Sequence, residues 1–297
     1  MSHGAVVLSA VPTLFREDGS VDLEANRALY AFVGSLVDGL FVAGSTGEFP
    51  ALEDAERLEL FELAMAAVGP DRVVAHIGAP DARHAGRLAR AAAGLGVTRI
   101  AAITPYYLPV RPDELTAHYA QIREAAPDPE CYAYIFPERT VVPVPPPLFA
   151  LLATSTGLAG AKVSGSASAD LAAYVAAAPG LAIFSGNDAD PAATMRAGGA
   201  GVISGRSSAY PEVYAALRAA LDAGDEAAAR RHQEALDRIV RLGASIGRLK
   251  YALELRGFGR AVARMTVDPP NQETAAAIVA RVASLPEPRP NPVDVTA

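Results

Sequence analysis

The sequence lacks several features that mark particular classes of protein. It has a single cysteine, Cys131, among 297 residues, which excludes an internal disulfide and is typical of a reducing cytoplasm. No apolar run is long enough to cross a membrane, and the first residues lack the basic and then apolar pattern of a signal peptide. We therefore expect a cytoplasmic protein without a membrane partner.

Positive charge is also scarce. The 26 lysines and arginines face 33 aspartates and glutamates, for a net charge of −7 and an isoelectric point near 5.3, which argues against nucleic acid as a partner. The five histidines are scattered, and only His76 falls within an expected strand, where we expect it to pack. Asp188 and Asp190 have no His or Glu nearby in the sequence, so we expect neither a metal nor a cofactor.

Lysine is the rarest charged residue. Arginine occurs at 24 positions and lysine at only two, Lys162 and Lys250. A guanidinium does not lose its proton in water, whereas a buried amine can, and a neutral amine attacks carbonyl carbons to form Schiff bases. Lys162, inside the apolar run Leu158 to Val163, therefore suggests a nucleophile, the alternative being a lysine at a strand end that reaches solvent. Lys250, in a late helical segment, suggests a helix-surface or packing residue.

Short apolar runs alternate with longer segments of helical spacing. Eight runs lack period-two alternation, as expected for parallel strands covered on both faces; they span residues 6–11, 39–44, 73–78, 100–104, 131–136, 158–163, 181–186 and 201–205. A helical segment follows each run, at residues 23–37, 53–68, 82–95, 112–125, 145–153, 167–177, 191–197 and 211–221. This order predicts an α/β fold, a (β/α)8 TIM barrel.

The chain continues beyond the eighth unit. Three more amphipathic helices are expected at residues 225–242, 244–255 and 272–285, and the proline-rich stretch from Pro286 to Pro292 is expected to be a flexible tail. We expect a barrel over residues 1–222 and a C-terminal helical appendage with its tail over residues 223–297, all within one domain.

In such barrels chemistry occurs where strands end and βα loops begin. After the second run comes Gly44-Ser45-Thr46-Gly47-Glu48, whose glycines and successive N–H groups can hold a carboxylate; a tight turn capping a helix is the alternative. Ser45 and Thr46 add hydroxyls that can relay protons.

The other strand ends supply a phenol and an arginine. Tyr134 can shuttle protons beside a Schiff base, and Arg139 has the planar fork that suits a second carboxylate. Each tyrosine taken alone is more commonly a core residue. The remaining strand ends carry the candidates Tyr107, Gly186 and Ile203.

These residues occur in an order that is similar to the dihydrodipicolinate synthase/N-acetylneuraminate lyase family of class I aldolases. The similarity rests on five stretches: Gly44 to Glu48, Pro105 to Tyr107, Tyr134 with Pro137 and Arg139, Gly160 to Lys162, and Gly186 to Asp188 followed by Gly201 to Ser204. It runs from about Val6 to the segment 247–250 and weakens afterwards.

The resemblance implies roles for individual residues. It implies Lys162 as the Schiff-base lysine for pyruvate or another 2-keto acid, Tyr134 as the proton relay, and Ser45 and Thr46 as the carboxylate-binding segment. Tyr107 would reach a neighbouring subunit's site in a homotetramer built from tight dimers, or in a homodimer. Arg139 matches the arginine that receives the second substrate in the synthase branch.

Some positions depart from the family pattern. Ser45 stands where the synthases have a threonine, Ile135 where an asparagine is common, and Val141 where a glycine is expected. Val163, Ser164 and Gly165 replace an acidic pattern after the lysine. The preferred interpretation is therefore a lyase that cleaves or forms an aldol of a 2-keto acid and an aldehyde, for example a 2-keto-3-deoxy sugar acid.

Three alternatives remain open. One is 4-hydroxy-tetrahydrodipicolinate synthase, which condenses pyruvate with aspartate semialdehyde. Another is a catalytically silent barrel that binds 2-keto acids. A pyridoxal phosphate protein is disfavoured because no phosphate-binding sequence follows the seventh and eighth runs.

Overall fold

The computed structural model describes residues 6–243 and 245–288. Its eight strands follow one another in chain order in a sheet that closes into a barrel, with parallel pairing wherever the register is defined. This confirms the predicted (β/α)8 barrel. The strands are β1 Val6–Ala10, β2 Gly39–Val42, β3 Val73–His76, β4 Arg99–Ile103, β5 Glu130–Ile135, β6 Gly160–Val163, β7 Ala182–Ser185 and β8 Gly201–Ser204.

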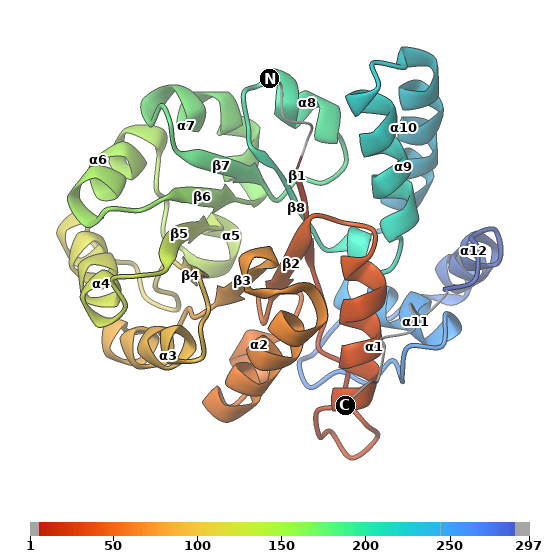
Figure 1. Cartoon of the computed structure of the whole chain (residues 1–297), viewed down its shortest axis with the longest axis horizontal. Coiled ribbons are helices and arrows are strands. Elements are labelled where there is room, and N and C mark those ends of the chain that lie inside the picture. The colour runs from red at the N-terminus through yellow and green to blue at the C-terminus, as the bar shows by residue number, and fades with distance from the viewer. Residues whose placement is uncertain (1–5, 244, 289–297) are drawn as a thin grey trace. The chain divides into compact units, whose positions relative to one another are not determined.

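Helices alternate with the strands (Figure 1). They are α1 Leu23–Gly34, α2 Asp54–Val68, α3 Ala82–Gly94, α4 Pro112–Ala125, α5 Pro137–Thr140, α6 Pro146–Thr156, α7 Leu171–Ala177, α8 Pro191–Arg196, α9 Pro211–Asp222, α10 Glu226–Val240, α11 Ile246–Leu255 and α12 Gln272–Ala283. The short α5 and four 3-10 turns, η1 Phe49–Ala51, η2 Pro70–Arg72, η3 Gly165–Asp170 and η4 Arg206–Ser208, were not expected from periodicity. None of the helices in the described ranges has both the length and the apolar character needed to span a bilayer.

The chain contacts divide the described residues into two compact units. The first consists of Val6 with Val73–Ile203, and the second of Val7–Arg72 with the residues from Ser204 onward. In the first unit, α3, α4, α6 and α7 lie on the outer side of the strands (Figure 1). All residues of β3 and β6 are buried, which explains why their sequences do not alternate between apolar and polar.

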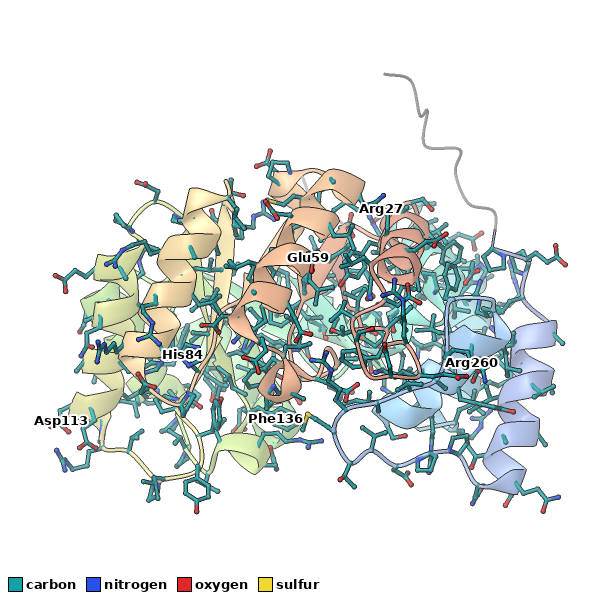
Figure 2. The ribbon with its side chains drawn as sticks, turned by 90° about the horizontal axis from the view of Figure 1, so that it is seen from below. Arg27, Glu59, His84, Asp113, Phe136 and Arg260 are labelled. Atoms are coloured by element: carbon teal, nitrogen blue, oxygen red, sulfur yellow. The ribbon has the colours of Figure 1, made fainter. Side chains whose placement is uncertain are left out.

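The second unit carries the C-terminal helices. Helix α10 packs on α9, and α12 packs on α11, which confirms the predicted helical appendage. Arg27 on α1 and Glu59 on α2, both labelled in Figure 2, are exposed on the outside of their helices. The predicted flexible tail begins at Pro286, and from residue 289 onward it lies outside the described residues.

Helix α4 buries a histidine. His118 is 5% exposed, and its Nε2 has no hydrogen-bond partner among the described residues. Burial lowers the pKa of His118 to about 4, although Asp81 acts in the opposite direction. The side chain is therefore neutral in the folded protein over a range in which an unfolded histidine is charged.

We predict that this histidine makes folding sensitive to mild acid. An unfolded histidine has a pKa of about 6.5, so between that pH and pH 4 the unfolded chain binds the extra proton. The contribution of His118 to the free energy of unfolding should be fully present above pH 6.5 and should fall as the pH is lowered to 4, by roughly 3 kcal/mol in total. Urea denaturation at several pH values should show a shallower decline for His118→Gln than for the wild type, whereas parallel curves would contradict the prediction.

Candidate active site

The amine of Lys162 lies against the ring of Tyr134. The Cα atoms of Lys162 on β6 and Tyr134 on β5 are paired, and paired residues on neighbouring strands direct their side chains to the same face of the sheet. Nζ of Lys162 lies 4.3 Å from the ring centroid of Tyr134, and the two residues are only 6% and 2% exposed. The structure thus brings the predicted amine and phenol together, and the alternative of a lysine reaching solvent does not fit this burial.

Two further rings surround Tyr134. Phe136, labelled in Figure 2, lies with its ring centroid 6.1 Å from that of Tyr134, and His76 meets Tyr134 edge-on at 5.9 Å. Nε2 of His76 accepts the backbone N–H of Ile103 at 3.3 Å. His76 therefore packs in the barrel, as the sequence predicted, and fixes one side of the phenol ring.

Hydrogen bonds hold α5, which carries Arg139, at two of its residues, Thr140 and Glu138. The first attachment is through Thr140. Thr104 donates its hydroxyl hydrogen to Thr140 at 2.9 Å, and Thr140 donates to the carbonyl oxygen of Phe136 at 3.2 Å. Arg139 itself is exposed, with its guanidinium carbon 5.5 Å from the ring centroid of Phe136. Hydrogen bonds thus connect the C-terminal residue of α5 to Thr104 and Phe136, while the side chain of Arg139 is exposed to solvent.

The second attachment of α5 is through the carboxylate of Glu138, a residue that the sequence analysis did not identify as functional. Glu138 accepts the backbone N–H of Ser166 at 2.7 Å, and hydrogen bonds from the Ser166 side chain and backbone lower the pKa of this carboxyl. A Cβ at Gly165, whose φ is +61°, would lie 2.0 Å from Oε2 of Glu138. The carboxylate therefore occupies the space beside a glycine and ties α5 to the turn that follows Lys162.

Val141 ends α5 in a left-handed conformation. Its φ and ψ are 55° and 18°, a region that a β-branched residue occupies only under strain. The side chain is 57% exposed and forms no part of the core. A valine thus occupies the position at which the family resemblance leads one to expect a glycine.

The other predicted residues of the first unit have different environments. Gly186 allows close packing, because a Cβ there would lie 2.0 Å from Oγ of Ser164. Ile203 is 4% exposed on β8. Tyr107 is 87% exposed and has a φ of 84°, so it does not join the buried cluster of Lys162 and Tyr134. The sulfur of Cys131 is buried in β5, which raises the pKa of the thiol to about 12 and makes it unreactive.

The loop Gly44–Glu48 belongs to the second unit. Its carbonyl oxygens are used within the protein: that of Ser45 accepts the N–H of Glu48 at 3.2 Å, that of Gly44 accepts the N–H of Phe49 at 3.3 Å, and that of Gly47 accepts the hydroxyl of Thr13 at 2.8 Å. In contrast, no hydrogen bond among the described residues has the N–H of Thr46 or Gly47 as donor. Two successive amides without a protein acceptor form a site of the kind that binds carboxylates.

Glu48 and Lys250 form a buried ion pair that the sequence did not reveal. Both side chains are fully buried, and Nζ of Lys250 donates to Glu48 and, at 2.7 Å, to the carbonyl oxygen of Val262. The prediction of a helix-surface residue at Lys250 is therefore wrong, and the packing alternative is right. The rarity of lysine in this chain was the available signal, but nothing local identified Glu48 as the partner.

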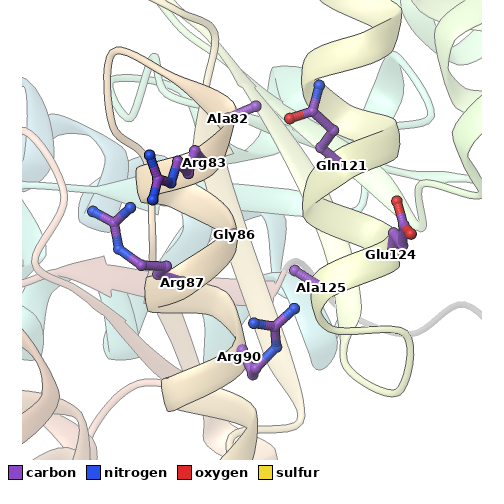
Figure 3. A pocket seen from close by; sticks show the side chains of 8 residues that line it. All are labelled: Ala82, Arg83, Gly86, Arg87, Arg90, Gln121, Glu124 and Ala125. Carbon is purple, nitrogen blue, oxygen red and sulfur yellow. The ribbon is translucent and has the colours of Figure 1, made fainter.

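A surface groove between α3 and α4 has a volume of about 460 Å³. It contains neither a lysine nor a tyrosine, so it does not resemble the site of Lys162 and Tyr134. It is lined by Ala82, Arg83, Gly86, Arg87, Arg90, Gln121, Glu124 and Ala125. Figure 3 shows the side chains of Arg83 and Arg87 directed away from α4, so the guanidinium groups do not converge on a common point. No group of three or more His, Cys, Asp or Glu side chains suited to a metal ion occurs among the described residues either.

Known proteins resemble this chain over nearly its full length. The model of the Dihydrodipicolinate synthetase family matches residues 4–284. A 4-hydroxy-tetrahydrodipicolinate synthase of Mycolicibacterium paratuberculosis is 35% identical over 282 residues, which cover 92% of each chain.

Solved structures of similar proteins share the fold. YagE of E. coli K12, a prophage protein of the dihydrodipicolinic acid synthase family in complex with pyruvate, is 27% identical with a TM-score of 0.85, over 94% of this chain and 97% of that one. Ruminococcus gnavus sialic acid aldolase is 26% identical with a TM-score of 0.84, again over 94% and 97%.

We predict that Val141→Gly stabilises the fold. Releasing an L-residue from the left-handed region gains about 1–2 kcal/mol, and the greater freedom of glycine in the unfolded chain offsets about 0.5–1 kcal/mol of this. Urea denaturation should therefore show a net gain of roughly 0.5–1 kcal/mol. Val279→Gly on α12, where the valine is 44% exposed, is the matched control and should lose stability because glycine is a poor helix former. Equal losses in both variants would contradict the prediction.

Proposed function

The chain belongs to the Dihydrodipicolinate synthetase family, and we propose that it is a lyase that acts through a Schiff base between Lys162 and the ketone of pyruvate or a related 2-keto acid. The supporting observation is the buried amine held 4.3 Å from the ring of Tyr134. The proposal is supported by similarity to proteins named as a 4-hydroxy-tetrahydrodipicolinate synthase and as a sialic acid aldolase.

The proposed sequence of bonds begins with the amine. Neutral Nζ attacks the ketone carbon to give a carbinolamine, which loses water to give an imine. The protonated imine withdraws electrons, so the neighbouring carbon can lose a proton to form an enamine. In condensation the enamine carbon bonds to an aldehyde carbon, whose oxygen takes up a proton. In cleavage the aldol imine loses the proton of its hydroxyl, the carbon–carbon bond breaks to give an aldehyde and the enamine, and the enamine carbon takes up a proton to give the imine. Water finally hydrolyses the imine and restores the amine.

Tyr134 is assigned the proton transfers of these steps. The carbinolamine needs a proton on its departing hydroxyl. The phenol of Tyr134 can supply it, because Tyr134 is paired with Lys162 on the neighbouring strand. Nε2 of His76 is occupied by the N–H of Ile103, so His76 is assigned a supporting role rather than proton transfer. Ser45 and Thr46 are proposed to assist with their hydroxyls, as the resemblance implies.

The carboxylate of the keto acid is assigned to the loop Gly44–Gly47. The N–H groups of Thr46 and Gly47, which donate to no acceptor among the described residues, suit two carboxylate oxygens. Gly186 and Ile203 are assigned contacts with the remainder of the substrate.

The second substrate is proposed to be an aldehyde that carries hydroxyl or carboxylate groups. Arg139 is exposed on an anchored helix, which suits a ligand that enters from solvent, and its fork can bind either kind of group. Ile135 and Ser45 favour a 2-keto-3-deoxy sugar acid over aspartate semialdehyde. We propose that the protein is a cytoplasmic homotetramer or homodimer in which the exposed Tyr107 serves a neighbouring site.

Borohydride trapping tests the Schiff base. Wild-type protein reduced in the presence of pyruvate should gain the mass of one reduced pyruvyl group, located at Lys162 by peptide mapping. Lys162→Arg should gain nothing and should lose turnover to background, because a guanidinium stays protonated. An unmodified wild type that still binds pyruvate would instead indicate a silent binding protein, and an active Lys162→Arg would refute the scheme.

Removal of one hydroxyl tests the proton relay. Tyr134→Phe should slow imine formation by about 10²- to 10⁴-fold with little change in unfolding temperature, since only the oxygen is lost. Stopped-flow trapping measures the rate, and Tyr132→Phe, on the same face of β5, is the matched control. Equal rates for wild type and Tyr134→Phe would remove Tyr134 from the mechanism.

A further inference from the structure

The second lysine of the chain lies in a site that the chemistry above does not use. Lys250 on α11 meets Glu48, the last residue of the loop Gly44–Glu48, and both side chains are fully buried. Nζ of Lys250 also lies 4.3 Å from the ring centroid of Phe15. A charged pair in such a place is costly to bury unless its hydrogen bonds are satisfied.

Glu48 is satisfied on both of its oxygens. Oε1 accepts from Lys250, and Oε2 accepts the backbone N–H groups of Arg264 and Met265 at 2.9 and 2.7 Å. The carboxylate thus joins α11 and the segment 264–265 to the loop, across more than 200 residues of sequence.

The fixed side chain constrains the loop backbone. Glu48 has φ and ψ of 58° and 38°, a left-handed conformation that persists only where surrounding contacts hold it. In this conformation its N–H closes the turn onto the carbonyl of Ser45 at 3.2 Å. The hydroxyl of Thr13 holds the carbonyl of Gly47 on the other side. The carbonyl of Ser45 lies in one peptide plane with the N–H of Thr46, so holding this carbonyl fixes the direction of that N–H. The peptide that carries the N–H of Gly47 lies between two held peptides, the one before it and the one after it.

We propose that Lys250 is a positioning residue for substrate carboxylate binding, acting through Glu48 on the amides of Thr46 and Gly47. The proposal rests on the assignment of this loop to the carboxylate in the proposed function. A lysine suits the position because one small ammonium group donates to both Glu48 and Val262. The space beside Phe15 already holds the guanidinium of Arg264, 4.6 Å from the ring centroid, so a second guanidinium would be crowded.

The test compares Lys250→Met with the matched control Arg248→Met. Arg248 lies on the same helix and pairs with the exposed Asp268 at 2.9 Å, so the control also removes one cation and one ion pair. Half-saturating concentrations are measured by borohydride trapping at Lys162 with two ketones, pyruvate and the uncharged hydroxyacetone, and unfolding temperatures are recorded for each variant.

For Lys250→Met we expect the half-saturating pyruvate concentration to rise about 10- to 100-fold, the range that corresponds to losing one well-aligned hydrogen bond to a charge. The half-saturating concentration of hydroxyacetone, which has no carboxylate, should stay within about twofold of the wild-type value. The maximal extent of trapping should equal that of the wild type. Arg248→Met should behave as the wild type with both ketones.

Other outcomes overturn the proposal. If Lys250→Met lowers the unfolding temperature but leaves the pyruvate value within twofold of wild type, the pair serves stability alone. If the half-saturating concentrations of both ketones rise equally, the substitution does not act on carboxylate binding. Should Lys250→Met fail to fold, the double variant Glu48→Gln, Lys250→Met, which leaves no unpaired buried charge, is measured against the same criteria. If wild-type protein is not trapped at all, the proposed function fails instead.

Discussion

The parallel pairing of β5 with β6 is the constraint on which the amine site depends. Backbone hydrogen bonds set the register, and the register sets Tyr134 beside Lys162. A slip of one residue would turn the lysine to the helical side of the strand, where Ala161 and Val163 now lie. The position of a reactive group is therefore fixed by the main chain before any side chain contributes.

The features that arise from local patterns were predictable from the sequence. Apolar runs and helical spacing gave the eight strands, and α2 was expected at residues 53–68 and observed at Asp54–Val68. Because strand ends gather at one mouth of a barrel, the sequence also indicated that Lys162 and Tyr134 would meet. Their distance and burial depend on packing, which periodicity does not report.

Features that depend on distant partners were not predictable. Glu48 and Lys250 are 202 residues apart, and Glu138 reaches Ser166 over 28 residues. Neither pair has a recognisable spacing, because the contact exists only after the chain has folded. The short helix α5 was missed for a related reason: its four residues are fewer than two turns, too short for a 3.6-residue period to appear.

The two lysines show that burial alone does not select this residue type. Arg256 is also buried, where it pairs with Glu212 and donates to the carbonyl of Ala209. A guanidinium thus serves where a flat, wide donor fits. Lys250 donates to a carboxylate and a carbonyl, and Lys162 lies over the ring of Tyr134. Arg256 makes both kinds of contact as well, since its guanidinium lies over the ring of Phe32, so these contacts do not by themselves distinguish the lysines from this arginine.

The carboxylate of Glu138 occupies the volume in which a side chain at position 165 would stand. A side chain at position 165 would therefore displace this carboxylate, the end of an exposed side chain, and would break its hydrogen bond with the N–H of Ser166. Since Glu138 precedes Arg139 and Gly165 follows Lys162, the absence of a side chain at position 165 is what allows α5 to be tied to the turn after β6.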